Sequence, residues 1–110
     1  MSVGSDLIAA LASTTLPVEL DNYAGTASSY ITINYNTIPD LFASDAPQFE
    51  RYLIQVHLTT LATTNVTTLI TTIKNALVAA GYSYPSMINA SENVSERHLV
   101  FETETAVYIG

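Results

Sequence analysis

The sequence predicts an α+β fold: a single domain spanning residues 1–110, with a mostly antiparallel sheet of four to five strands and two helices packed on it. Two segments show apolar residues at helical spacing, and several others alternate apolar and polar residues as strands do. The chain has 110 residues, of which 48% are hydrophobic and 12% charged, and it contains no cysteine. That composition fits one ordinary domain with an apolar core and no disulfides.

The first predicted helix covers residues 2–16. Leu7, Ile8 and Leu11 share one face, Asp6 suits the positive first turn, and Pro17 ends the segment. Residues 18–20 can form a short strand.

Two strands are expected in the middle of the chain, at residues 30–35 and 50–60. The first reads YITINY; the second, ERYLIQVHLTT, has an apolar face of alternate residues, with Leu53 as the exception on its polar face. Pro39 and Pro47 lie between the two strands. Because proline cannot donate to a strand ladder, residues 36–48 are expected to be a long ordered loop rather than a strand.

A second amphipathic helix is expected over residues 64–80. Thr64 or Asn65 can cap it, and Gly81 suits the position just beyond its end. Its outer face is rich in threonine, which fits either neutral surface or a contact with another subunit. Strands near residues 87–89 and over residues 98–108 complete the chain. Apolar residues expected at a subunit interface are Tyr82, Tyr84 and Met87.

The charge balance argues against several classes of function. With three Lys and Arg against ten Asp and Glu, the formal charge is −7. A domain that grips nucleic acid or an anionic membrane needs clustered basic residues, which this chain lacks. The N-terminus lacks the basic start of a signal peptide, and no apolar run is long enough to span a membrane.

Signals for catalysis or for a cofactor are weak, and we expect neither. His57 and His98 lie on separate predicted strands, without a metal-binding or catalytic spacing, and no phosphate-binding glycine motif occurs. The simple interpretation is that both histidines are half-exposed residues of the sheet. The alternative is that one of them acts as a general base or a metal ligand. Glu102 and Glu104 share one face of a strand, about 7 Å apart. They belong either to a solvated sheet face or to an acidic channel wall.

Three segments resemble the tail-terminator, or tail-completion, proteins of long-tailed phages. These are the YITINY strand, the following loop IPDLFASDAP at residues 38–47, and the strand ERYLIQVH at residues 50–57. The downstream IKNALVAAGYSYP at residues 73–85 and the closing HLVFE at residues 98–102 are also similar. The resemblance covers residues 5–107.

The resemblance implies a virion protein without catalytic activity or cofactor. Such proteins assemble in the host cytoplasm as a ring, usually hexameric, at the head-proximal end of the tail tube. They stop tube growth and receive the head-completion complex, and genomic DNA passes through without specific binding. The rigid, acidic loop suggests contacts with another subunit or with the tube, at Pro39, Asp40, Phe42, Pro47 and Arg51.

An acidic lumen would repel the DNA backbone and let the genome slide through. The candidates for its lining are Asp40, Asp45, Glu102 and Glu104. Two other interpretations stay open: a head-closure or connector protein of the phage neck, and a small oligomeric enzyme or ligand-binding domain that uses His57 or His98.

Overall fold

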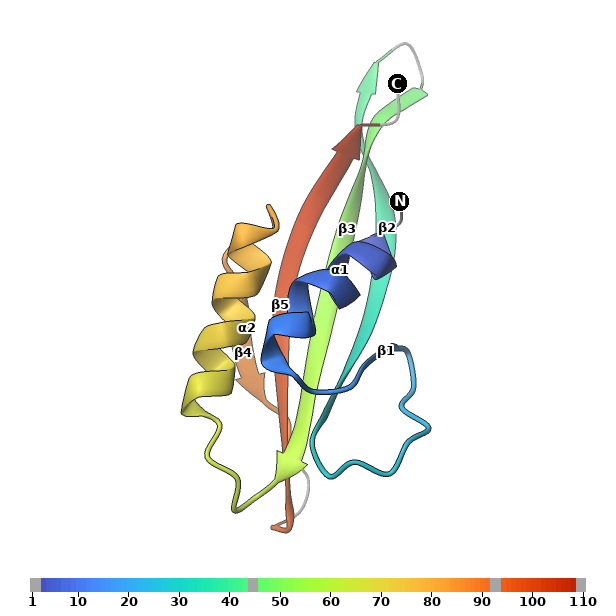
Figure 1. The fold of residues 1–110 in the computed structure, drawn as a ribbon. Helices are drawn as coiled ribbons and strands as arrows, with labels where there is room; N and C mark the ends of the chain where they lie inside the picture. Colours follow the sequence, from blue (N-terminus) through green and yellow to red (C-terminus); the bar gives the residue numbers. More distant parts are fainter. Residues whose placement is uncertain (1–2, 44–45, 92–93, 109–110) are drawn as a thin grey trace.

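The computed structural model describes residues 3–43, 46–91 and 94–108; of residues 39–49 and 107–108 it describes the backbone alone. Two helices and five strands form an α+β fold, which confirms the predicted fold class (Figure 1). The helices are α1 (Val3–Leu11) and α2 (Thr67–Ala79), and a 3₁₀ turn, η1 (Ala12–Thr14), follows α1. The strands are β1 (Val18–Leu20), β2 (Tyr30–Ala43), β3 (Ala46–Leu61), β4 (Ser86–Asn89) and β5 (Glu96–Tyr108).

The five strands form one sheet in the order β1-β2-β3-β5-β4. The pairs β2–β3, β3–β5 and β4–β5 are antiparallel, and β1 pairs with β2 in parallel. The register aligns Ile33 with Val56, and Val56 with Phe101. Because side chains alternate along each strand, this register gathers the apolar residues of the three long strands on one face.

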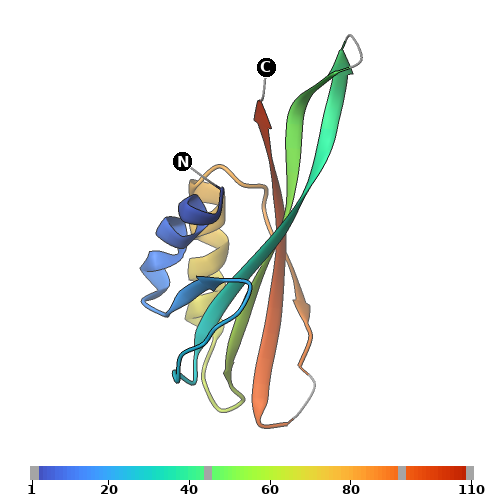
Figure 2. The ribbon, with the colours of Figure 1, turned by 90° about the vertical axis from the view of Figure 1, so that its right-hand side faces the viewer.

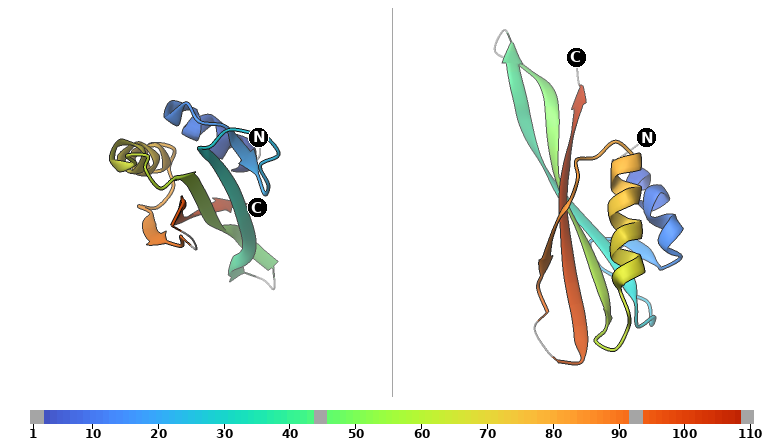
Figure 3. Two further views of the ribbon diagram at one scale, coloured as in Figure 1. Left: turned by 90° about the horizontal axis from the view of Figure 1, so that it is seen from below. Right: turned by 90° about the vertical axis from the view of Figure 1, so that its left-hand side faces the viewer.

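Both helices cover that apolar face, and no helix of the described residues lies over the opposite face (Figures 2 and 3). We call this uncovered side the open face. The core between helices and sheet includes Phe101, which is fully buried, with Leu7 and Leu11 from α1 and Ile73 and Leu77 from α2. This two-layer arrangement is the one expected when only one face of an antiparallel sheet is apolar.

The first helix is shorter than predicted, because the chain leaves the α-helix after Leu11. Thr14 Oγ1 donates to the carbonyl of Leu11 at 2.7 Å, and Thr15 has a left-handed φ of 62°. Threonine side chains that bond to the backbone compete with helical hydrogen bonds, and the segment closes as a 3₁₀ turn.

The second helix begins and ends close to its predicted limits. Asn65 Oδ1 accepts the N–H of Thr67 at 3.0 Å at its start. At its end, the N–H of Gly81 donates to the carbonyl of Val78 and that of Tyr82 donates to the carbonyl of Leu77. With Gly81 at φ 96°, these two bonds form a Schellman motif, as the position of Gly81 predicted.

The predicted loop at residues 36–48 is wrong, because both flanking strands continue through it. β2 runs to Ala43 and β3 begins at Ala46, and Pro39 pairs with Glu50 while Phe42 pairs with Pro47. Both prolines stand where their strand has a neighbour on one side only among the described residues: β1 ends beside Ile33, and β5 reaches no further than Phe49. A strand edge tolerates proline, because its outward amide needs no ladder partner.

Candidate functional site

The long strands extend well beyond the helices and form an arm (Figures 1 and 3). We define the arm as residues 36–52, from β2 and β3, together with residues 105–108 of β5. Tyr35 and Tyr52, whose ring centroids lie 5.6 Å apart, mark the end of the helix-covered core. The molecule measures 54 × 25 × 25 Å, and the arm accounts for much of its length.

Apolar side chains are exposed where the arm leaves the body. Ile38 is 44% exposed and Leu53 is 37% exposed. The register places them one step apart on the open face, since Ile38 pairs with Arg51 and Asn36 pairs with Leu53. Tyr35, on the helix-covered face, is also 36% exposed. Apolar residues at a bare sheet position of this kind are typical of contact surfaces.

The arm presents free backbone edges on both sides. On one side, β1 pairs with β2 only at residues 31–33. On the other side, β4 pairs with β5 only at residues 99–102, and Ser83 bonds to Glu104 just beyond. Among the described residues, β2 from Asn34 onward and β5 after Glu104 therefore have a strand neighbour on one side only. Such edges are templates for pairing with another chain.

The structure brings the predicted contact residues together in this arm. Pro39, Asp40 and Phe42 lie in β2, and Pro47 and Arg51 lie in β3 on the facing strand. In the register Asp40 pairs with Phe49 and Arg51 pairs with Ala106 of β5. The five positions therefore share a β-ribbon rather than a loop.

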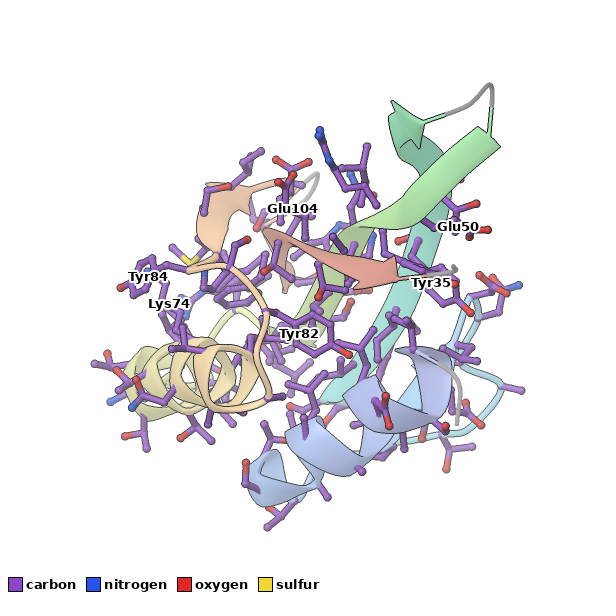
Figure 4. All side chains as sticks on the ribbon, turned by 90° about the horizontal axis from the view of Figure 1, so that it is seen from above. Tyr35, Glu50, Lys74, Tyr82, Tyr84 and Glu104 are labelled. Carbon is purple, nitrogen blue, oxygen red and sulfur yellow. The ribbon has the colours of Figure 1, made fainter. Side chains whose placement is uncertain are left out.

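The acidic candidates are divided between the arm and the body. Glu102 and Glu104 lie in β5, exposed on the open face, as their spacing predicted, and Figure 4 shows Glu104 on the side of the sheet away from the helices. Asp40 lies in the arm, and Asp45 lies outside the described residues. Glu102 is not isolated, since its Oε2 accepts a hydrogen bond from Gln55 Nε2 at 3.2 Å.

A row of hydrogen-bonded polar side chains crosses the open face from β5 through β3 to β2 and back. Asn34 Nδ2 donates to Gln55 Oε1 at 3.5 Å, and Asn34 Oδ1 lies 2.9 Å from His57 Nε2. His57 Nδ1 lies 2.8 Å from His98 Nε2. With the bond from Gln55 to Glu102, five side chains form one connected chain, which we call the open-face chain.

Two hollows lie along this row. One, of about 450 Å³, is lined by polar residues that include Asn36, Ser86 and Glu104, and by the apolar Leu53 and Ile54. The other, of about 510 Å³, lies over the histidines and is bordered by Asp21, Asn22 and Tyr23 from the loop after β1. Burial, and secondarily the nearby His98, lower the pKa of His57 below the usual 6.5.

Sequence reasoning did not bring the two histidines together. They are 41 residues apart, and their contact depends on the β3–β5 register, which places His98 opposite Thr59, two residues from His57. The alternation of apolar and polar residues could have shown that each histidine lies on the polar face of its strand. The sequence does not show that the two strands are neighbours. Among the described residues, no group of three or more His, Cys, Asp or Glu is placed to hold a metal ion.

One expected interface residue is wrong. Tyr82 is buried in the core, between α2 and the sheet in Figure 4, and burial, with the Asp6 carboxylate second, raises the pKa of its hydroxyl. Tyr84 and Met87, by contrast, are exposed, at 73% and 39%. The Lys74 ammonium lies 5.7 Å from the centre of the Tyr84 ring. The threonine face of α2 is exposed at Thr67, Thr68 and Thr71.

Fold and site together define a small α+β protein with an open polar sheet face and a projecting three-stranded arm. No protein-family model and no curated protein matches the chain. A solved structure is similar over 99% of this chain and 98% of its own, with a TM-score of 0.59 and 13% sequence identity. Its name states no function, and at this identity the likeness shows the fold alone. Within the described residues, neither helix is long and apolar enough to cross a membrane.

Proposed function

We propose that this chain is a structural protein of a phage virion. Six copies form a ring at the head-proximal end of a siphovirus tail tube. The ring ends tube assembly and joins the tail to the head-completion complex. The proposal starts from the resemblance of three sequence segments to tail-terminator proteins. It needs no catalytic residue and no cofactor.

The observation that best supports a ring is the arm with its two free edges. The edge of β2 and the edge of β5 lie on opposite sides of the same ribbon. If β2 of one copy pairs with β5 of the next, the contact is head-to-tail. Repeating that contact closes a ring when the rotation per copy divides a full turn evenly and no translation accompanies it. The exposed Ile38 and Leu53 would add apolar area to that contact.

The acidic composition supports passage of DNA rather than binding. A hexamer would carry six times the −7 charge of one chain. Glu102 and Glu104 are exposed on the open face, so that face would present carboxylates if it lined the lumen. A negative wall repels the phosphate backbone and lets the genome slide.

Two other functions are alternatives to the role of tail terminator. A head-closure or connector protein of the neck would use the same arm and the same charge. A small ligand-binding domain or enzyme would instead use the hollow of about 510 Å³ beside His57 and His98, which is the observation in its favour.

Substitutions in the arm test the ring. Ile38→Lys combined with Leu53→Lys should abolish rings and leave a folded monomer, because both side chains are exposed and outside the core. Val94→Lys, at a 97% exposed site remote from the arm, is the matched control and should leave assembly intact. Native mass spectrometry with circular dichroism reads both effects. Unchanged rings in the double variant would argue against the arm as the interface.

The defect caused by losing the gene separates the structural roles. Overlong tails indicate a terminator, whereas DNA leaking from full heads indicates a head-closure protein. Normal particles from a variant carrying His57→Gln and His98→Gln would remove the chemical support for a ligand-binding role.

Charge reversal tests the lumen. Glu104→Lys, alone and with Glu102→Lys, should slow DNA ejection in a salt-dependent way, because basic side chains would bind the phosphates as they pass. Asn75→Lys is the control, since Asn75 is exposed on α2, in the helix layer that covers the other face of the sheet. Unchanged DNA retention and ejection in the double variant would contradict an acidic lining by these residues.

A further inference from the structure

The open-face chain has a direction that its chemistry imposes. A carboxylate only accepts hydrogen bonds, so Gln55 must direct its NH₂ group to Glu102, and its oxygen then faces Asn34. Asn34 must therefore donate to Gln55, which leaves its own oxygen facing His57. Each amide transmits the orientation set by the carboxylate to the next residue.

The same logic assigns the protons of the histidines. Asn34 Oδ1 is an acceptor, so Nε2 of His57 carries the hydrogen. In neutral His57 the other nitrogen, Nδ1, is then an acceptor, and His98 Nε2 donates to it across 2.8 Å. Every donor in the chain points toward Glu102.

The geometry of the histidine pair favours a shared proton over a metal ion. The nitrogens are 2.8 Å apart and the ring centroids 5.0 Å apart. The difference is accounted for by the two ring radii, so the nitrogens point at each other nearly along the line joining the rings. Two imidazoles on one metal ion instead direct their lone pairs to a point beside that line.

We propose that His57 and His98 form a one-proton switch on the open face, held in a single tautomer by the chain that ends at Glu102. A first added proton is accommodated on Nδ1 of His98, because His98 Nε2 then still donates to the lone pair of His57 Nδ1. A second proton leaves both facing nitrogens as donors, so the link must break and the rings must separate. Low pH thus rearranges the open face, whether or not the protein forms a ring.

Several carboxylates lie on the same side of the sheet as the pair. On β5 these are Glu96, two residues before His98, and Glu102, reached through two amides, and from the loop after β1 Asp21 borders the same hollow. The β2 and β3 residues that line the hollow beside the pair carry hydroxyl or amide groups: Tyr30, Thr32, Asn34 and Thr59. The loop after β1 adds the phenol of Tyr23. The pKa of His57 is lowered, which agrees with a pair in which His57 does not readily take up a further proton.

Imidazole nitrogen NMR on the full-length protein tests the proposal. At neutral pH, His57 should be protonated at Nε2 and not at Nδ1, and the pair should titrate in two well-separated steps. In His98→Gln, the His57 pKa should rise toward the usual value but stay below it, because burial is the larger cause of its lowering and remains. Gln55→Leu, which cuts the link to Glu102, should mix the two tautomers of His57 without unfolding the protein.

Ser86→Ala is the matched control. Ser86 lies opposite Glu102 in the ladder and borders the hollow on the same face, but it is outside the open-face chain, so its loss should change neither the tautomer nor the titration. The proposal would be overturned by two independent titrations near the usual pKa, or by His57 protonated at Nδ1. Tight one-to-one binding of Zn²⁺ at neutral pH, with loss in His98→Gln, would likewise replace the proton switch with a metal site.

Discussion

Phe101 shows how strongly one residue depends on the register of the sheet. Its side chain is fully buried at the centre of β5, next to Val56 in the ladder and beneath the helices. Such a position combines a large apolar area with contacts to both layers. Leu99 lies on the same face of β5 and is buried with it.

Phe101→Ala should lower the free energy of unfolding by about 3–5 kcal/mol, because it removes buried apolar area and leaves a cavity. Urea denaturation followed by circular dichroism measures the loss. Val94→Ala, at a 97% exposed site, should change the same quantity by less than about 0.5 kcal/mol. A small loss for Phe101→Ala would mean that the helices do not pack on this face.

His57 should make stability depend on pH. Its pKa is lowered in the folded state, so between the usual value of 6.5 and the lower folded value the unfolded chain binds more protons. The contribution of His57 is therefore fully present above pH 6.5 and is lost as pH falls through the folded pKa. Urea midpoints measured across this range should fall more steeply for the wild type than for His57→Gln. Parallel pH profiles would contradict the lowered pKa.

At the scale of elements, local patterns predicted most of the helices and strands. The 3.6-residue spacing of apolar residues predicted α2, and Gly81 predicted where it ends. Strand alternation placed β3, and marked Leu53 as an apolar residue on the polar face, where it is exposed. These predictions rest on interactions within a few residues, which the sequence displays directly.

The arm could not be predicted, because whether a strand can contain a proline depends on which other strands lie beside it, and those strands are distant in sequence. Pro39 and Pro47 argue against a central strand, but an edge position removes the conflict, and only the strand order shows which strands are edges. The open-face chain was hidden for the same reason. Each of its links joins residues at least 21 positions apart.

The end of α2 gives a test at this scale. Gly81 has φ 96°, and a Cβ added there would meet no atom within 4 Å. Gly81→Ala should therefore lower the free energy of unfolding by about 1 kcal/mol through backbone strain alone. Gly81→Asn should cost less, since asparagine tolerates left-handed φ better. Thermal or urea unfolding measures both, and an equal loss in the two variants would argue against the Schellman motif.

At the scale of the whole molecule, the protein divides its surfaces by role. The helices and one sheet face make the core, the open face carries polar and acidic groups, and the arm extends edges and apolar residues away from the body (Figure 2). A monomer gains little stability from an uncovered ribbon with free edges. A head-to-tail assembly would give that ribbon its missing neighbours.

Electron microscopy of the purified protein, alone and with tail tubes, tests this account most directly. We predict closed rings of uniform size, free in solution or seated on one end of each tube, and no rings from the Ile38→Lys and Leu53→Lys variant. Particles that remain monomeric even when tubes are present would contradict the proposed function.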